Sequence, residues 1–177
     1  MAVVISKSTA ISNRDAVPKI LSDAIISGGE VLESEGYVAP ANGDSAGSKY
    51  LMCSVPSNAR LSSLVFQCSA LGAGAKLDIG ASYPSFIPRG AGLDAIVANQ
   101  VISANFFAAA LDVSAALAPA NVEASSGTYT IAKQELPLWS ALGLAADPGI
   151  ELDIVATVNV AMAAAGFAGI KAKYVKQ

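Results

Sequence analysis

The chain has 177 residues, enough to bury one hydrophobic core, and its formal net charge is −3 with a pI of about 4.8. It contains no histidine, which excludes Ser-His-Asp and Cys-His catalysis and histidine-ligated zinc, because histidine is the usual proton-transfer residue near neutral pH and the commonest metal ligand. An acidic chain without a basic cluster also argues against a nucleic-acid partner, since affinity for phosphates comes from Lys and Arg. We therefore expect a protein that is not an enzyme and holds no cofactor or metal.

Residues 1–29 differ from the rest and are predicted to form an N-terminal arm, with residues 30–177 as the main domain. The arm carries an apolar patch that consists of Ile20, Leu21, Ile25 and Ile26. Because the local sequence is too short to bury this patch, it is predicted to contact a neighbouring subunit. The alternative is a loosely packed chain terminus.

From Glu30 onward, short alternating runs are separated by Gly, Pro and Asn, which predicts an antiparallel β-sandwich of the all-β class. In chain order, strands are predicted over residues 30–39, 49–55, 60–69, 75–82, 100–107, 128–132, 152–160 and 170–174. Alternation places Leu77 and Ile79 inside and Asp78 outside, and it places Tyr129 and Ile131 on one side of their strand.

Several connections are also predicted. Residues 71–74 form a hairpin turn, because their two glycines accept positive φ, and residues 163–166 form the turn of a hairpin between the last two strands. Residues 108–117 form a short helix or a loop. A turn of helix follows Pro137, and Asp147-Pro148-Gly149 forms a β-turn.

Trp139 is the only tryptophan and is predicted to anchor one end of the core, because an aromatic ring supplies unusual packing area in a chain rich in small residues. The other predicted core residues are Leu138, Leu142, Leu152, Ile154, Val158, Phe66 and Ile79. Cys53 and Cys68 lie on the apolar sides of their runs, so they are interpreted as packed free thiols and not as a disulfide.

Two glycine motifs resemble catalytic or cofactor signatures. Residues 43–47 match the G-x-S-x-G nucleophile elbow, but no histidine can take the serine proton. Residues 90–95 match the dinucleotide fingerprint G-x-G-x-x-A, but no βαβ pattern surrounds them. Both are interpreted as loops.

Carboxylates offer the remaining candidate for ligand chemistry. Glu151 and Asp153, near Asp147, could hold Ca²⁺ through their oxygens, although solvated carboxylates are the favoured reading. Glu33 and Glu35 are interpreted as the solvated side of the first strand.

The sequence carries no membrane or secretory signature. Its first residues lack the charged and apolar regions of a signal peptide, and the longest uncharged stretch near the end, residues 154–170, is shorter than the ~20 apolar residues of a membrane span. We expect a protein made in the host cytoplasm without a membrane partner.

The segment Pro137-Leu-Trp-Ser-Ala-Leu-Gly-Leu-Ala-Ala-Asp-Pro-Gly, followed by Ile150-Glu-Leu-Asp-Ile-Val-Ala-Thr-Val, resembles the C-terminal half of the small capsid cement, or decoration, proteins of tailed bacteriophages. The closing Ile170-Lys-Ala-Lys-Tyr-Val, the runs at residues 60–68 and 76–80, Phe106-Phe107 and the Asn13-Arg14-Asp15 arm fit the same resemblance.

This resemblance implies a jelly-roll β-sandwich on the capsid exterior of a virion, bound to the major capsid protein. It also implies a homo-oligomer, a dimer or trimer, whose contacts to capsid or subunits include Asn13 and Arg14 beside the apolar patch. Two alternatives remain: a head-fibre base or tail-associated module, and a carbohydrate-binding sandwich, for which the sequence offers few exposed aromatic residues.

Overall fold

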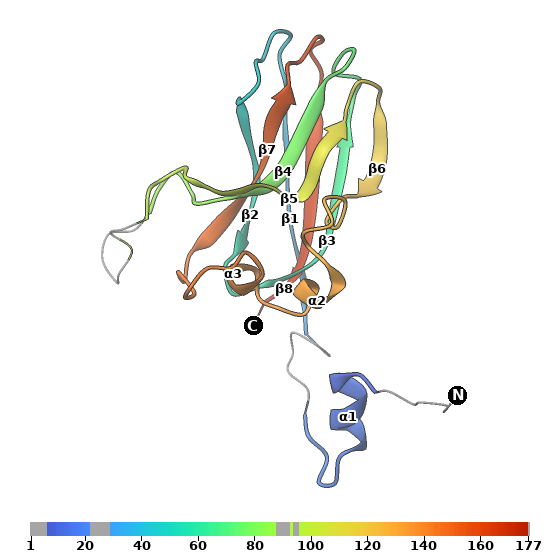
Figure 1. Ribbon diagram of the computed structural model, residues 1–177, viewed down its shortest axis with the longest axis vertical. Coiled ribbons are helices and arrows are strands. Elements are labelled where there is room, and N and C mark those ends of the chain that lie inside the picture. The colour runs from blue at the N-terminus through green and yellow to red at the C-terminus, as the bar shows by residue number, and fades with distance from the viewer. Residues whose placement is uncertain (1–6, 22–28, 88–92, 94–95, 177) are drawn as a thin grey trace.

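The computed structural model describes residues 7–21, 29–87, 93 and 96–176. Figure 1 shows two sheets packed face to face with a few short helices at one end, which confirms the predicted all-β sandwich. The strands are β1 (Val31–Val38), β2 (Lys49–Pro56), β3 (Arg60–Cys68), β4 (Lys76–Ser82), β5 (Val101–Asp112), β6 (Leu117–Asn121), β7 (Glu151–Val160) and β8 (Ala168–Val175). The helices are α1 (Thr9–Asp15), α2 (Ile131–Gln134) and α3 (Leu138–Ala141).

The strand order identifies the sandwich as a jelly roll. One sheet has the order β1-β8-β3-β6 and the other β2-β7-β4-β5, and every pairing is antiparallel. The chain therefore pairs its first strand with its last, its second with its seventh, its third with its sixth and its fourth with its fifth. This nested pairing across two sheets is the jelly-roll pattern.

Both predicted hairpins are wrong, because in each case the two strands belong to opposite sheets. β7 and β8 are not paired, and neither are β3 and β4. Alternation shows which side chains face the core, but the two sheets share one core, so it cannot tell a hairpin from a crossing between sheets. Gly72 and Gly74 do have positive φ, at 101° and 77°, within the β3–β4 crossing.

The middle of the chain also differs from the prediction. Residues 108–112 continue β5 and Leu117 begins β6, so the predicted helix or loop over 108–117 is wrong except at residues 113–116, which form a loop between these strands. β5 reaches this length through bulges, and at one of them Ala110 has a φ of 49° and its N–H donates to the Asp78 carboxylate at 2.6 Å. A side-chain acceptor on β4 thus replaces a regular strand partner.

The strand predicted over 128–132 is absent from the structure. Tyr129 lies in the loop that precedes α2, where its side chain is fully buried, whereas Ile131 begins α2 and is exposed. One side chain is therefore buried and the other exposed, whereas the prediction placed both on the same side of a strand.

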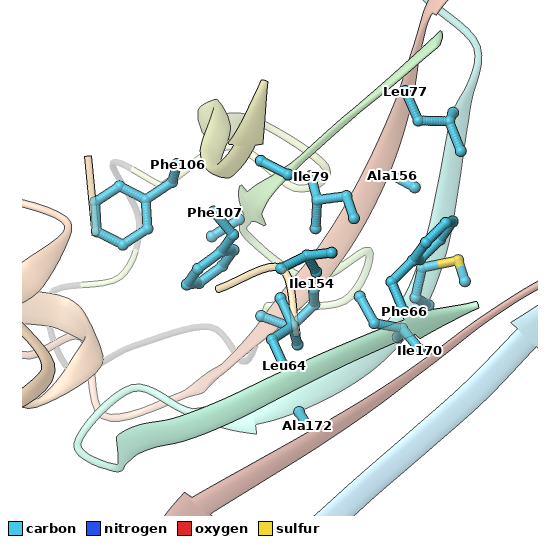
Figure 2. Packing of buried hydrophobic residues seen from close by; sticks show 14 of the residues in the cluster. Leu64, Phe66, Leu77, Ile79, Phe106, Phe107, Ile154, Ala156, Ile170 and Ala172 are labelled. Carbon is cyan, nitrogen blue, oxygen red and sulfur yellow. The ribbon is translucent and has the colours of Figure 1, made fainter. Parts of the chain in front are cut away.

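The core lies between the inner faces of the two sheets. Figure 2 shows Leu64 and Phe66 of β3 directed toward Ile154 of β7 and Ile79 of β4. Six of the predicted core residues are buried: Leu138, Leu152, Ile154, Val158, Phe66 and Ile79. Leu142 is partly buried and packs against the same cluster.

Trp139 is partly buried but belongs neither to the core cluster nor to the partly buried residues packed against it, so its predicted role as the core anchor is wrong. Adjacent residues on a short helix point in different directions, and in α3 it is Leu138 that enters the core. The backbone N–H groups of both residues are held, because Leu138 donates to the Ala59 carbonyl at 2.8 Å and Trp139 to the Ser57 carbonyl at 3.0 Å.

Gly36 lies where β1 crosses closest to β2. A Cβ atom at this position would lie 1.9 Å from the Met52 carbonyl oxygen, so only glycine allows the two backbones to meet. We expect Gly36→Ala to lower the free energy of unfolding by ~1–3 kcal/mol, as overpacking does, measured by denaturant titration. Gly169→Ala is the matched control, because its added Cβ would make an ordinary 3.6 Å contact with Tyr37. Equal losses in the two variants would contradict this account.

Candidate functional site

The N-terminal segment, residues 7–21, carries exposed apolar side chains outside the sandwich (Figure 1). Ser8 caps α1 by accepting from the Ile11 N–H at 3.4 Å, and Lys7 pairs with Asp15 at 2.9 Å. After α1 the chain bends at Val17 and Pro18 and turns back, with the Ile20 N–H donating to the Asn13 carbonyl at 3.2 Å, and Leu21 is 89% exposed. Apolar side chains exposed together in this way are typical of a contact surface.

The structure describes four of the six predicted contact residues. Asn13 and Arg14 belong to α1, and Ile20 is exposed like Leu21. Ile25 and Ile26 lie outside the described residues. The structure thus brings the described part of the apolar patch to an exposed position.

A second exposed feature, which we call the projection, was missed by the sequence analysis. It comprises the described residues between β4 and β5, where residues 83–87 and 96–100 run side by side away from the sheets (Figure 1). The Tyr83 N–H donates to the Gln100 carbonyl at 2.9 Å and the Asn99 N–H to the Pro84 carbonyl at 3.2 Å. Phe86 is 78% exposed and Val97 is exposed beside it in the fold. Apolar residues inside a glycine-rich loop were the signal available in the sequence.

The outer face of the β1-β8-β3-β6 sheet carries a ladder of charges. Lys171 lies 3.0 Å from Glu35 and 3.4 Å from Glu33, and Lys173 lies 3.3 Å from Glu33. The hydrogen bond from Lys173 lowers the pKa of Glu33, and the hydrogen bond to Glu35 raises the pKa of Lys171. These side chains are solvated, as predicted for Glu33 and Glu35, so the pairs contribute little to stability.

Beside this ladder the same face has a hollow of about 930 Å³. Its floor is the backbone around Gly169 of β8, and Tyr37 and Gln67 flank that glycine on the paired strands β1 and β3. Val65, Pro119, Phe167, Glu35 and Lys171 complete the walls. The sequence analysis did not find this site, because its residues come from four separate strands and one loop.

Of the two glycine motifs, the structure describes the first, residues 43–47, in full, and it lies in the loop between β1 and β2. In residues 43–47 the Asp44 carboxylate accepts from the Tyr50 hydroxyl at 2.5 Å and from the Ala41 N–H at 2.9 Å, so it orders a loop between two strands. A nucleophile elbow requires a strand-to-helix turn. Of the motif at residues 90–95, only Leu93 lies among the described residues.

Two of the three candidate calcium carboxylates, Glu151 and Asp147, accept hydrogen bonds at the sandwich surface. The Ser54 hydroxyl donates to Glu151 at 2.8 Å, and Asp147 accepts from the Ser57 hydroxyl at 2.5 Å. Burial, together with the nearby Glu151 charge, raises the pKa of Asp153. Within the described ranges, no three Cys, Asp or Glu side chains gather as a metal site would require.

The two cysteines are free thiols, and burial raises the pKa of both, that of Cys53 to about 12. Since the thiolate is the reactive form, we expect Cys53 to react at least ~100-fold more slowly with a thiol reagent in the folded protein than in denaturant at pH 8, and Cys68 to be slowed as well. Timed labelling followed by mass spectrometry measures both rates. Equal rates in the folded and unfolded protein would contradict the prediction.

None of the helices in the described part of the chain is long and apolar enough to cross a bilayer. No protein-family model and no curated protein matches the sequence. Its fold, however, recurs in two solved structures. A chain in the capsid of Ralstonia phage GP4 superposes with a TM-score of 0.55 at 19% identity, and a chain in the capsid asymmetric unit of cyanophage Pam1 with a TM-score of 0.52 at 15% identity. The match covers 84% of this chain and 86% of the other in both cases. The protein shares its fold with chains of phage capsids.

Proposed function

We propose that the protein is a non-enzymatic structural component of a phage virion, which binds the outer surface of the capsid and stabilises contacts between capsomers. The observation that carries this proposal is the fold likeness to chains of two phage capsid structures over 84% of the sequence. The resemblance of residues 137–158 to cement proteins narrows the role from capsid component to decoration protein.

The two exposed apolar features support a role in contacts between proteins. The N-terminal segment ends in the exposed Ile20 and Leu21, and the projection presents Phe86 and Val97. Exposed apolar side chains on extensions favour burial against a partner. We propose that the N-terminal segment and the sandwich face next to the projection contact the major capsid protein and a neighbouring copy, in a dimer or trimer.

Binding at such a surface would stabilise a shell by adding buried area between capsomers. A specific interface of standard size buries ~1,600 Å² in total. Repetition over the whole shell multiplies a modest gain at each site, because a bound protein that bridges two capsomers must be detached before they separate.

The test uses phage particles that lack this protein. The purified chain is added to expanded heads, and we expect saturable co-sedimentation, density on the outer surface in cryo-electron microscopy, and heads that withstand higher temperature. Density at a fibre or tail would instead identify a head-fibre base or a tail-associated module. No binding to heads would refute the capsid role.

The projection offers a sharper prediction for the same assay. We expect the double change Phe86→Ser and Val97→Ser to weaken head binding by at least about tenfold, because each buried large side chain contributes ~1.5–3 kcal/mol. Ile131→Ser is the matched control, since Ile131 is equally exposed but belongs to α2 at another site. Unchanged binding of the double variant would exclude the projection from the interface.

A further inference from the structure

The hollow exists because β8 presents no side chain at Gly169, its second residue. Gly169 is paired with Tyr37 on one side and Gln67 on the other, so a side chain is missing between two that rise from the sheet. Its volume of about 930 Å³ is within the range of small-molecule binding sites, ~300–1,000 Å³. The outer sheet face is therefore concave here.

Aromatic rings stand at two sides of this hollow. Tyr37 is 81% exposed, and Phe167, in the loop before β8, is 43% exposed. When an apolar surface covers an apolar ring face that was exposed to water, the free energy falls. The C–H face of a sugar ring is such a surface, and it is of similar size to an aromatic ring.

Polar groups lie in the same walls. The Tyr37 hydroxyl and the Gln67 amide have no hydrogen-bond partner within the described ranges, and both can donate and accept. A purely apolar occupant would bury these groups without hydrogen-bond partners, which is unfavourable. Saccharide hydroxyls would satisfy them, and this difference favours a saccharide over an apolar peptide.

The charges at the rim indicate which kind of saccharide the hollow would bind. The ladder beside the hollow holds two carboxylates, Glu33 and Glu35, and two ammonium groups, Lys171 and Lys173, which pair with one another. The rim therefore has no net charge and offers an acidic sugar no unpaired cation. We propose that the hollow on the β1-β8-β3-β6 face binds a neutral hexopyranose of a glycan, with Tyr37 as the stacking platform and Gln67 as the hydrogen-bonding group.

This proposal concerns the isolated protein and does not depend on capsid binding. On a particle, many copies would present the same face, and avidity would then exceed the affinity of a single site. That last step alone rests on the proposed function.

The test is a titration of the full chain, labelled with ¹⁵N, by NMR. The probes are neutral oligomers of glucose, galactose, mannose and N-acetylglucosamine, with sialyllactose as the acidic comparison. We expect at least one neutral oligomer to shift the amide signals of Tyr37, Gln67 and Gly169, and sialyllactose to shift them less. The same oligomers displayed on beads should capture the protein.

Variants separate the roles of the residues. We expect Tyr37→Ala to weaken binding by about tenfold, the equivalent of the ~1.4 kcal/mol that a stacked ring contributes. Tyr37→Phe should keep the stacking and stay within about threefold of the parent. Gly169→Leu should fill the hollow and abolish binding, whereas Ile131→Ser, on α2 outside the hollow, serves as a folded control with binding retained.

Three outcomes would overturn the proposal. The first is that none of the neutral oligomers shifts the hollow or captures the protein above background. The second is that Tyr37→Ala and Gly169→Leu bind as well as the parent. The third is that a synthetic peptide of residues 7–21 shifts the hollow while no sugar does, which would make it a contact between copies. Failure of head binding with intact sugar binding would refute the capsid role alone.

Discussion

Replacement of Tyr129 by alanine is expected to lower the free energy of unfolding by ~3–5 kcal/mol, the range for deletion of a large aromatic side chain from a core. Tyr129 is the largest fully buried side chain in the described structure. Its ring lies 5.4 Å from the rings of both Phe106 and Phe107, and Phe107 meets it edge to face. Its hydroxyl donates to the Leu61 carbonyl at 2.8 Å, which joins the loop before α2 to β3.

Two further variants separate the contributions of ring and hydroxyl. Tyr129→Phe keeps the ring but leaves the buried Leu61 carbonyl without this donor, so we expect a loss of ~1–3 kcal/mol. Trp139→Ala should cost less than Tyr129→Ala, because the indole is only half-buried. Denaturant unfolding followed by circular dichroism measures all three. The account fails if Trp139→Ala proves the most destabilised of the set.

The sequence predicted the buried aliphatic residues correctly but not the aromatic residue at the centre of this cluster, which is Tyr129 and not Trp139. Ile79 occupies an inward position of the alternating strand β4, and Leu138 is the first residue of helix α3. Both are buried as predicted. Tyr129 lies outside regular structure, so no period predicts its direction. Its burial depends on the loop after β6 folding over the open end of the sandwich, a long-range arrangement that local pattern does not encode.

Strand pairing was the second feature that the local sequence pattern could not predict. Alternation identified β7 and β8 as strands but suggested that they pair with each other, although the chain crosses to the opposite sheet between them. Crossing and hairpin connections of similar length have similar composition, because both use glycine and small residues. The jelly-roll order came only from the resemblance to cement proteins.

The two candidate surfaces also differ in whether local sequence could reveal them. The apolar patch of the N-terminal segment is continuous in sequence, so Ile20 and Leu21 could be singled out from composition alone. The hollow requires Tyr37, Gln67 and Gly169 to be neighbours, and they become so only when β8 inserts between β1 and β3. Each of these residues is unremarkable in its own strand, so their combination is visible only in the fold.

A variant that lacks residues 1–29 is expected to keep the sandwich but to lose binding to phage heads and self-association. Among the described residues the core begins at Met52, so the deletion removes no described core residue, and we expect the circular dichroism spectrum and the unfolding midpoint to stay close to those of the parent. The exposed Ile20 and Leu21 would be removed together with the rest of the arm. Light scattering measures the oligomeric state and co-sedimentation measures head binding.

A double change, Ile20→Ser with Leu21→Ser, tests whether apolar burial is the cause. Ordering a segment at an interface costs ~1–2 kcal/mol of backbone entropy per residue, and for the short stretch after α1 the burial of apolar side chains must exceed that cost. Loss of these two side chains should therefore weaken binding by at least about tenfold, whereas Ile131→Ser should leave it unchanged. If the double variant binds heads as well as the parent while the deletion does not, the contact lies elsewhere in residues 1–29. If the deletion itself binds and assembles normally, the N-terminal segment is a loose terminus and contributes nothing to the interface.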